Sequence, residues 1–209
     1  MIEIKNLSKK IKKTYVLRDI NFKFEKGKIY GLFGRNGSGK TMLLRSIAGL
    51  IIPTEGQILV EDKELHKDIS FPKNLGIIIE NMELLPQFDA YKNLEILAKI
   101  KKVASEQDIK ESIKRVGLLN VQDLKLRKYS LGMKQRLNIA QAIFEKPDLL
   151  LLDEPTNAID ENGVKLINQI LLEEKKRGCT IIIATHLKDD IISICDEILH
   201  LDDGRIYHE

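Results

Sequence analysis

The stretch Gly34–Thr41, GRNGSGKT in one-letter code, decides the fold. It matches the pattern G-x-x-x-x-G-K-[ST] in full and follows the apolar run Ile29–Phe33, which is typical of a strand buried on both faces. Behind it, apolar residues recur at helical spacing from Leu43 to Ala48, and Gly49 closes the helix. The pattern therefore stands where a phosphate-binding loop works, between a buried strand and the start of a helix.

The residue types of this loop suit a nucleoside triphosphate. Glycines let successive backbone N–H groups curl around a phosphate chain, and the helix N-terminus adds partial positive charge. Lys40 can reach the β- and γ-phosphates, and Thr41 can offer its hydroxyl to Mg²⁺. The spacing differs from the dinucleotide pattern G-x-G-x-x-G, which disfavours a Rossmann dehydrogenase. The candidate nucleotide-binding residues are Asn36, Gly37, Ser38, Gly39, Lys40 and Thr41.

A pair of carboxylates follows a second buried run. Leu149–Leu152 ends in Asp153 and Glu154, and a buried strand of an open α/β sheet delivers its last residues to the edge where ligands bind. Asp153 is placed to hold Mg²⁺, directly or through water, and Glu154 to orient or deprotonate an attacking water. A base candidate here favours a hydrolase over a kinase, although phosphoryl transfer to another acceptor stays open.

Buried runs and helical patterns alternate along the chain, which predicts an α/β fold with a mostly parallel sheet and helices on both faces. Near the N-terminus, Ile2–Ile4 and Phe22–Phe24 instead alternate with polar residues. This pattern predicts half-buried strands that form a separate antiparallel β layer. The expected buried strands are Ile29–Phe33, Leu75–Ile79, Leu149–Leu152 and Thr180–Ala184, and shorter candidates are Gln57–Glu61 and Ile198–Leu201.

The segment from Asn81 to Ser130 shows helix signals and no convincing strand. Ser105 with Asp108 resembles a capping box, and Gly117 ends the helix that follows it. We expect a single domain over residues 1–209, in which 1–80 and 135–209 form a P-loop NTPase core with its antiparallel layer. Residues from about 81 to 134 are expected to form a helical subdomain inserted into that core.

Composition excludes several classes of protein. The 209 residues include 43% hydrophobic residues, 5 prolines and 13 glycines, so a sizeable core can form and the chain is not disordered, collagenous or a disulfide scaffold. The 34 basic and 31 acidic residues leave a net charge of +3, and no nucleic-acid partner is expected from so weak a field.

The chain is expected to be cytoplasmic. No apolar run approaches the ~18 residues of a membrane-spanning helix. Met1–Lys5 alternates like a strand and does not resemble a signal peptide. Cys179 and Cys195 lack C-x-x-C spacing and are expected to be ordinary core residues in a reducing compartment.

Several motifs together carry a resemblance to a known family. The phosphate loop, the carboxylates after Leu149–Leu152, the stretch Tyr129–Arg136 (YSLGMKQR) and His186 closely resemble the ATP-binding subunits of ABC transporters. The similarity runs over essentially the whole chain, and the motifs come in the family's order. It implies an ATPase that uses ATP and Mg²⁺. It also implies two partners, which are a second ATPase subunit (identical or different) in a head-to-tail dimer and a transmembrane permease subunit that holds the chain on the inner face of the cell membrane.

The resemblance also implies roles for single residues. In the family, each ATP lies between the phosphate loop of one subunit and the signature loop of the other, so Ser130 and Gly132 are implied to contact the partner's nucleotide. His186 matches the switch histidine that contacts the γ-phosphate, which makes Glu154 and His186 the implied catalytic residues. Asp160 matches a loop that touches the partner subunit.

Three positions depart from the family's pattern. Glu80 replaces the glutamine that usually contacts Mg²⁺ and the membrane part, and a carboxylate would bind Mg²⁺ more strongly than an amide. The family commonly stacks adenine on an aromatic residue near Ile11, where this chain has none, and Tyr15 is the nearby candidate. Leu131 replaces a glycine of the signature loop. The candidate metal ligands are therefore Thr41, Glu80 and Asp153.

Glutamate at position 80, with Gly-Met-Lys-Gln in the signature, resembles the subgroup tied to bacitracin resistance, lantibiotic immunity and peptide export. We therefore expect a motor for ATP-driven transport, and in particular for export of peptide or antimicrobial compounds. Two alternatives stay open. A soluble ABC-type ATPase acting on nucleic acid or ribosomes is disfavoured by the chain length and charge. A nucleotide-binding regulatory module with little turnover is kept open by Glu80 and Leu131.

Overall fold

The computed structural model describes residues 1–80, 84–186 and 188–208, and two β-sheets form its frame. Six strands form the larger sheet, in the order β10-β9-β3-β8-β7-β6. Neighbouring strands run parallel except in the β9–β10 hairpin, so the expected mostly parallel sheet is confirmed. The strands are β3 (Ile29–Phe33), β6 (Leu75–Ile78), β7 (Leu149–Asp153), β8 (Thr180–Thr185), β9 (Glu197–Asp202) and β10 (Arg205–His208).

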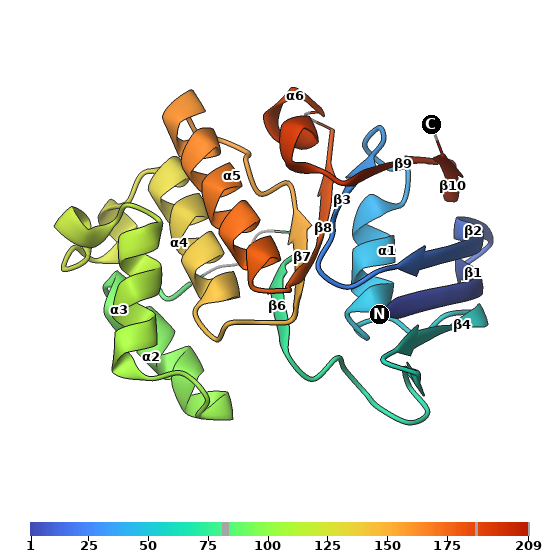
Figure 1. Cartoon of the computed structure of the whole chain (residues 1–209), viewed down its shortest axis with the longest axis horizontal. Coiled ribbons are helices and arrows are strands. Elements are labelled where there is room, and N and C mark those ends of the chain that lie inside the picture. Colours follow the sequence, from blue (N-terminus) through green and yellow to red (C-terminus); the bar gives the residue numbers. More distant parts are fainter. Residues whose placement is uncertain (81–83, 187, 209) are drawn as a thin grey trace.

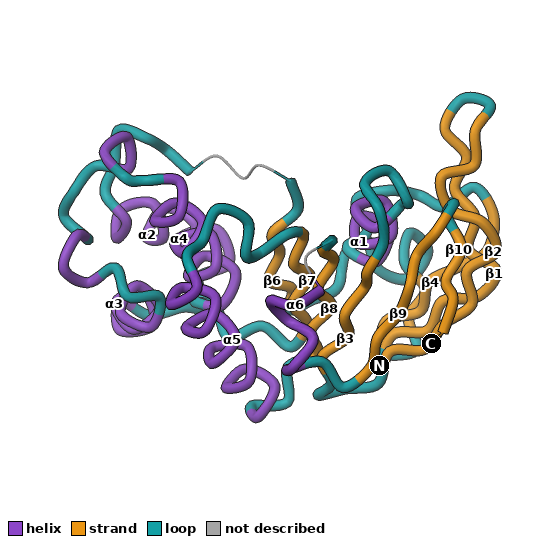
Figure 2. Tube along the Cα trace, turned by 90° about the horizontal axis from the view of Figure 1, so that it is seen from above, coloured by secondary structure: helices purple, strands orange, loops and turns teal. Residues whose placement is uncertain are grey.

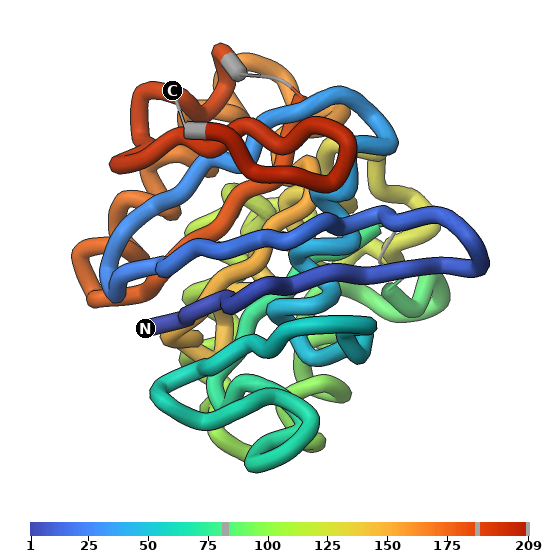
Figure 3. The backbone as a smooth tube through the Cα atoms, turned by 90° about the vertical axis from the view of Figure 1, so that its right-hand side faces the viewer, coloured from blue at the N-terminus to red at the C-terminus, as the bar shows by residue number. Residues whose placement is uncertain are grey.

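The smaller sheet is the antiparallel layer expected near the N-terminus. Its order is β2-β1-β4-β5, and all its neighbouring strands are antiparallel. Figure 3 shows the long β1–β2 hairpin in this layer, with the β9–β10 hairpin of the larger sheet next to it. The strands are β1 (Ile2–Ile11), β2 (Thr14–Phe24), β4 (Glu55–Val60) and β5 (Lys63–Glu64).

Helices cover both faces of the larger sheet (Figure 1). Helix α1 lies between the two sheets, whereas α4 and α5 cover the opposite face of the larger sheet. The helices are α1 (Lys40–Ile47), α2 (Ala90–Lys101), α3 (Glu106–Arg115), α4 (Leu131–Ile143), α5 (Glu161–Lys176) and α6 (Lys188–Ile191). Short 3-10 turns are η1 (Leu119–Val121), η2 (Leu126–Lys128) and η3 (Ile192–Ile194).

The central strands divide their side chains between two hydrophobic cores. Along β8, Ile181 and Ile183 belong to the core shared with helices α2 to α5. Ile182 and Ala184 belong to the core shared with α1 and the antiparallel sheet. Successive side chains of a strand point to opposite faces, so burial on both faces requires the unbroken apolar runs seen in the sequence.

The segment between β6 and α4 is helical in its described part. Helices α2 and α3 and the turns η1 and η2 occupy residues 84–130 without a strand among them, and Figure 2 shows the two helices far from the antiparallel sheet. Residues 81–83, where the helical subdomain was expected to begin, lie outside the described residues. The capping box of α3 is confirmed, because Ser105 Oγ accepts from the Asp108 N–H (3.2 Å) and Asp108 Oδ2 accepts from the Ser105 N–H (2.9 Å).

A buried ion pair attaches α3 to the core. Glu174 of α5 has a side chain only 4% exposed, and it pairs with Arg115 of α3 at 2.6 Å and with Arg177 at 2.8 Å. A carboxylate this deeply buried is stable only while it is paired, and Glu174 has two arginine partners. The helical segment is therefore held to the core by charge as well as by apolar packing.

Two strands were missed by the sequence analysis. Strand β5 has 2 residues and β10 has 4, so neither is long enough to show a clear alternation of apolar and polar residues. Both cysteines are free thiols, with Cys179 buried and Cys195 half-buried against the same core. In the described ranges of the chain, no helix combines the length and the apolar composition that crossing a membrane requires.

Candidate functional site

A cavity of about 360 Å³ opens at the phosphate loop. It gathers residues from the β1–β2 hairpin, the loop, the first turn of α1 and the end of β7. Because β3 and β7 lie in one parallel sheet, their carboxyl ends meet at the same edge. The cavity is lined by Ile11, Val16, Asn36, Gly37, Gly39, Lys40, Thr41, Met42, Asp153 and Glu154.

The N-terminus of α1 opens into this cavity without a side-chain cap. Its N-cap residue, Gly39, has φ 110°, and a Cβ there would lie 2.7 Å from the carbonyl oxygen of Val16. Gly37 has φ 82° with open space where its Cβ would be. Glycine is the residue that adopts both conformations without strain. The first backbone N–H groups of α1 are therefore left for an anion in the cavity.

Lys40 is folded inside the loop, and only 6% of it is exposed. Its Nζ donates to the carbonyl oxygens of Gly34 (2.7 Å) and Arg35 (3.2 Å). Burial lowers the pKa of Lys40, while the carboxylates of Glu154 and Asp153 act to raise it. The ammonium group is thus held by neutral carbonyls and can exchange them for phosphate oxygens.

A hydroxyl and a carboxylate meet where a divalent cation was predicted. Thr41 Oγ1 donates to Asp153 Oδ2 at 2.6 Å, and Asp153 is 9% exposed. Burial raises the pKa of Asp153, and the Thr41 hydrogen bond opposes this. Within the described residues, no group of three or more His, Cys, Asp or Glu could hold a metal ion. Two oxygen ligands suit Mg²⁺, which usually keeps several waters and takes one or two protein carboxylates plus phosphates.

Glu154 is held from three sides at the end of β7. Its backbone has φ 49°, and its N–H donates to the Ala184 carbonyl at 2.8 Å. Thr185 Oγ1 donates to Glu154 Oε2 at 2.6 Å. His186 contacts Glu154 Oε1 through its backbone N–H at 3.1 Å and its Nδ1 at 2.7 Å. The structure thus brings the two sequence-predicted catalytic residues into direct contact.

Glu80 lies outside the cavity lining. Its carboxylate pairs with Arg45 Nη2 at 2.5 Å, and its side chain is 57% exposed. Its backbone has a positive φ of 57°, two residues beyond the end of β6 at Ile78. This ion pair was not predictable from the sequence, because Arg45 lies on the solvent side of α1 and no local pattern connects it with position 80.

Tyr15 also lies outside the cavity lining. It pairs with Lys10 across the β1–β2 ladder, and its hydroxyl donates to Glu55 Oε1 at 3.1 Å. Val16, the next residue along β2, and Ile11 do line the cavity. Neighbouring side chains of a strand face opposite sides, so Val16 and Tyr15 cannot both point to the nucleotide.

The signature residues stand apart from this cavity. Ser130 is the N-cap of α4 and accepts from the Met133 N–H at 3.2 Å. Ser130 is exposed, and Leu131 is 69% exposed beside it. At Gly132, a Cβ would lie 2.9 Å from the Ala158 carbonyl oxygen, so α4 lies directly against the turn that follows Glu154. Neither Ser130 nor Gly132 lines the chain's own phosphate cavity.

The turn between β9 and β10 supports the phosphate loop, a role that sequence reasoning missed. Gly204 N–H donates to the Ser38 carbonyl at 3.0 Å, and the Gly204 carbonyl accepts from the Arg18 N–H at 2.8 Å. The Asp202–Gly204 sequence signalled a turn, but it carried no sign of what the turn would touch. Thr185 was missed for a similar reason, because a threonine that ends a buried strand has no motif of its own.

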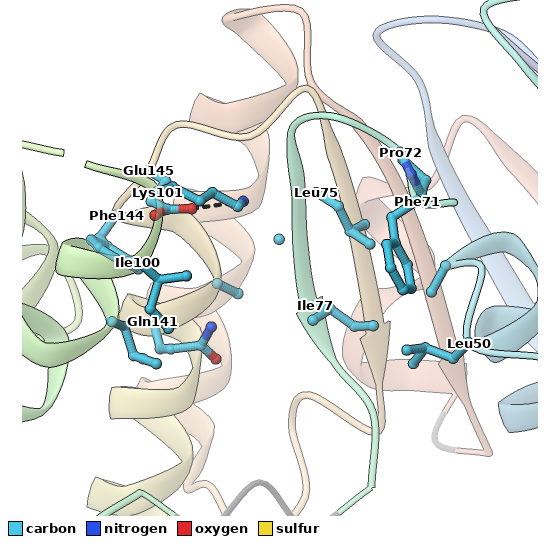
Figure 4. Close-up of a pocket in the computed structure, with 14 residues that line it drawn as sticks. Leu50, Phe71, Pro72, Leu75, Ile77, Ile100, Lys101, Gln141, Phe144 and Glu145 are labelled. Carbon is cyan, nitrogen blue, oxygen red and sulfur yellow. Dashed lines mark hydrogen bonds and ion pairs between the residues drawn. The ribbon is translucent and has the colours of Figure 1, made fainter. Parts of the chain in front are cut away.

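A second cavity, of about 400 Å³, separates the helical segment from β6. Figure 4 shows Leu75 and Ile77 of β6 on one side of it and Ile100 of α2 on the other. Its rim exposes large apolar side chains, which are Leu50 (56%), Phe71 (55%) and Ile100 (76%). Lys101 and Glu145 form an ion pair at 2.9 Å at this groove.

Comparisons with known proteins agree with these observations. The family model described as ABC transporter matches residues 17–157. An uncharacterized ABC transporter ATP-binding protein of Bacillus subtilis, YybJ, is 68% identical over 99% of this chain and 94% of its own length. The lantibiotic transport ATP-binding protein SrtF of Streptococcus pyogenes is 36% identical over 100% of this chain and 90% of its own. The bacitracin transport ATP-binding protein BcrA of Enterococcus faecalis is 37% identical over 100% of this chain and 68% of its own length.

A solved structure extends the likeness to three dimensions. The dimeric structure of a post-hydrolysis state of an ATP-binding cassette, bound to ADP and Pi, is similar with a TM-score of 0.89 at 25% identity. The likeness covers 100% of this chain and 97% of that chain. The resemblance inferred from the motifs is thus confirmed, and this chain belongs to the ABC transporter family as one of its ATP-binding ATPase subunits.

Proposed function

We propose that this chain is the cytoplasmic motor of a membrane transporter and works as a head-to-tail pair with a second ATPase subunit. One observation carries the proposal. The phosphate cavity is complete on one side of the molecule, while the exposed N-terminus of α4, with Ser130, lies outside it. A capped helix end that points away from the chain's own nucleotide suits a nucleotide held by another subunit.

ATP is held by the loop and the first turn of α1. The backbone N–H groups from Asn36 to Thr41 surround the phosphates, and Lys40 exchanges the carbonyls of Gly34 and Arg35 for β- and γ-phosphate oxygens. The base lies against Ile11 and Val16, which are the apolar residues of the cavity lining nearest the β1–β2 hairpin. Contact with these residues replaces stacking on an aromatic ring.

Thr41 and Asp153 are the proposed Mg²⁺ ligands. They already share a hydrogen bond of 2.6 Å, so the two oxygens lie next to each other beside the phosphate loop. When bound, Mg²⁺ neutralises charge that develops on the β- and γ-phosphates during transfer to water. Glu80 becomes available as a further ligand only when its ion pair with Arg45 opens.

Glu154 is the proposed general base and His186 the residue that senses the γ-phosphate. In the structure the two bind each other, and Thr185 fixes the second carboxylate oxygen of Glu154. Arrival of the γ-phosphate at His186 Nδ1 or Nε2 loosens that pair. Glu154 is then free to accept a proton from the attacking water.

The permease is proposed to dock in the apolar groove between α2 and β6. Leu50, Phe71 and Ile100 expose apolar side chains at its rim, and contiguous exposed apolar surface marks an interaction site. The occupant we propose is a short cytosolic helix of the transmembrane permease subunit. Docking there joins the helical segment, about residues 84–134, and the core, so rotation of one against the other reaches the membrane.

The transported compound is proposed to be a peptide or antimicrobial compound, and the direction is proposed to be export. This rests on the likeness to the lantibiotic and bacitracin transport ATP-binding proteins. The chain itself would lie on the inner face of the cell membrane, attached through its permease.

The variant Glu154→Gln tests the proposed mechanism. It keeps the hydrogen-bonding shape and removes the base, so ATP hydrolysis should fall at least about 100-fold. ATP-bound dimers should accumulate and elute earlier in size-exclusion chromatography. The matched control is Glu111→Gln on the exposed face of α3, which should keep the wild-type rate. A Glu154→Gln protein that hydrolyses ATP like the wild type would show that the assigned base is wrong.

A further inference from the structure

One side chain connects α4 with the turn that carries Glu154. Gln135 Nε2 donates to the backbone carbonyl oxygens of Glu154 (3.3 Å) and Pro155 (3.2 Å). Asn138, which is 8% exposed on the same helix, donates to Gln135 Oε1 at 3.5 Å. An amide has distinct donor and acceptor ends, so this contact turns the donor end of Gln135 toward the turn.

The same helix touches that turn at a second point. Gly132 approaches the Ala158 carbonyl so closely that a Cβ would lie 2.9 Å from it. Glu154 and Ala158 both have positive φ, 49° and 62°. Non-glycine residues keep this conformation only where the surroundings hold it. The first turns of α4 and residues 154–158 therefore form one packed unit.

The two ends of this unit serve different nucleotides in the proposed dimer. Ser130 lies five residues before Gln135, about 7.5 Å along the helix axis, on the exposed end that meets the partner's ATP. Glu154, whose carboxylate is held by Thr185 and His186, serves the chain's own ATP. A displacement of α4 on contact with the partner's nucleotide is therefore transmitted to the backbone of Glu154 through Gln135.

We propose that Gln135 is a positioning residue that couples the two ATP sites of the dimer. This inference rests on the proposed function, because it needs a second subunit whose ATP contacts Ser130. Gln135 touches no nucleotide in this scheme. Its two hydrogen bonds to the backbone at Glu154 and Pro155 align the general base Glu154 of one ATP site. This alignment depends on whether ATP occupies the other site.

The variant Gln135→Leu tests the coupling in the full-length chain. Leucine has a similar size but donates no hydrogen bond, so kcat should fall about tenfold while KM for ATP stays the same. The Hill coefficient for ATP should fall from above 1 in the wild type to 1. ATP-dependent dimerisation in the Glu154→Gln background should persist. The matched control is Gln169→Leu on α5, where the lost amide donates to Glu173 of its own helix at 3.2 Å.

Each result decides the matter. A Gln135→Leu protein with the wild-type kcat and Hill coefficient overturns the coupling, as does a wild type that dimerises yet has a Hill coefficient of 1. A variant whose KM and thermal midpoint change together with kcat also overturns it, because general loosening of α4 predicts that pattern. A Glu154→Gln protein that stays monomeric with ATP overturns the proposed function first, and the coupling with it.

Discussion

Helices α1 and α4 both present an N-terminus to phosphate in the proposed mechanism, but they are built differently. The N-cap of α1 is Gly39, no side chain caps the helix, and its first turn opens into the cavity. The N-cap of α4 is Ser130, which accepts from Met133 N–H and stands exposed. Uncapped N–H groups cost free energy unless something binds them. Helix α1 is thus prepared for a ligand of its own, whereas α4 is stable without one.

Removing the charge at α1 should have the largest effect. The variant Lys40→Ala deletes the ammonium group that is proposed to bind the β- and γ-phosphates, so the rate of phosphate release from ATP should fall by about 100-fold to 1,000-fold. Binding of labelled ATP should weaken in parallel. The matched control is Lys13→Ala, which removes an exposed lysine between β1 and β2. If Lys40→Ala hydrolyses ATP within about threefold of the wild-type rate, Lys40 at the start of α1 does not have the proposed role in hydrolysis.

Removing the Ser130 side chain should reveal whether Ser130 only caps α4 or also binds a nucleotide. Ser130→Ala is best compared with Ser105→Ala, because Ser105 is the exposed N-cap of α3. Each variant should lose about 1 kcal/mol of stability on thermal unfolding. Only Ser130→Ala should also lose activity, about tenfold, since Ser130 alone is proposed to contact a nucleotide, that of the partner subunit. Equal losses of activity in the two variants would argue that Ser130 is merely structural.

Adding an aromatic ring to the phosphate cavity next to α1 should strengthen nucleotide binding there. Ile11 is 44% exposed and lines the cavity beside Val16. In Ile11→Tyr, stacking on the base should tighten binding of a fluorescent ATP analogue about fivefold to tenfold. Tyr15→Ala is the control, because it removes the aromatic ring of Tyr15 together with its hydrogen bond to Glu55. If Tyr15→Ala weakens nucleotide binding, adenine stacks on Tyr15 rather than lying against Ile11.

Helix α3 supplies a third N-terminus, which is capped and purely structural, and its pH dependence should give the smallest effect. Lys146 and Ser105 hold the pKa of Asp108 at about 2, below its ordinary 3.8. A depressed pKa means that the carboxylate stabilises the fold above pH 3.8, and that this contribution is lost as pH falls through about 2. Asp108→Asn should therefore lower the thermal midpoint at pH 7 by a few degrees. The gap to the wild type should close toward pH 2, and a constant gap would contradict this assignment.

The sequence was sufficient wherever one local stretch carries the whole signal. The phosphate loop, the buried strands and the Ser105–Asp108 cap each depend on neighbours within a few residues, and their positions were predicted. The placement of Glu80 and Tyr15 was not predictable in this way. Glu80 depends on Arg45 of another element, and Tyr15 depends on the register of the β1–β2 ladder. Such contacts arise only after distant segments are packed together.

The β9–β10 turn has a consequence for the order in which this molecule is made. The Gly204 N–H supports the Ser38 carbonyl of the phosphate loop, and the start of β3 is held by a bond from Gly27 N–H to Thr180 Oγ1, 153 residues away. A nascent chain therefore carries its nucleotide loop outside the ribosome long before β8 and β9 are synthesised. Such distant pairing forms late and slowly. The phosphate loop is therefore expected to reach its folded geometry only after β8, β9 and the β9–β10 turn have been synthesised and packed.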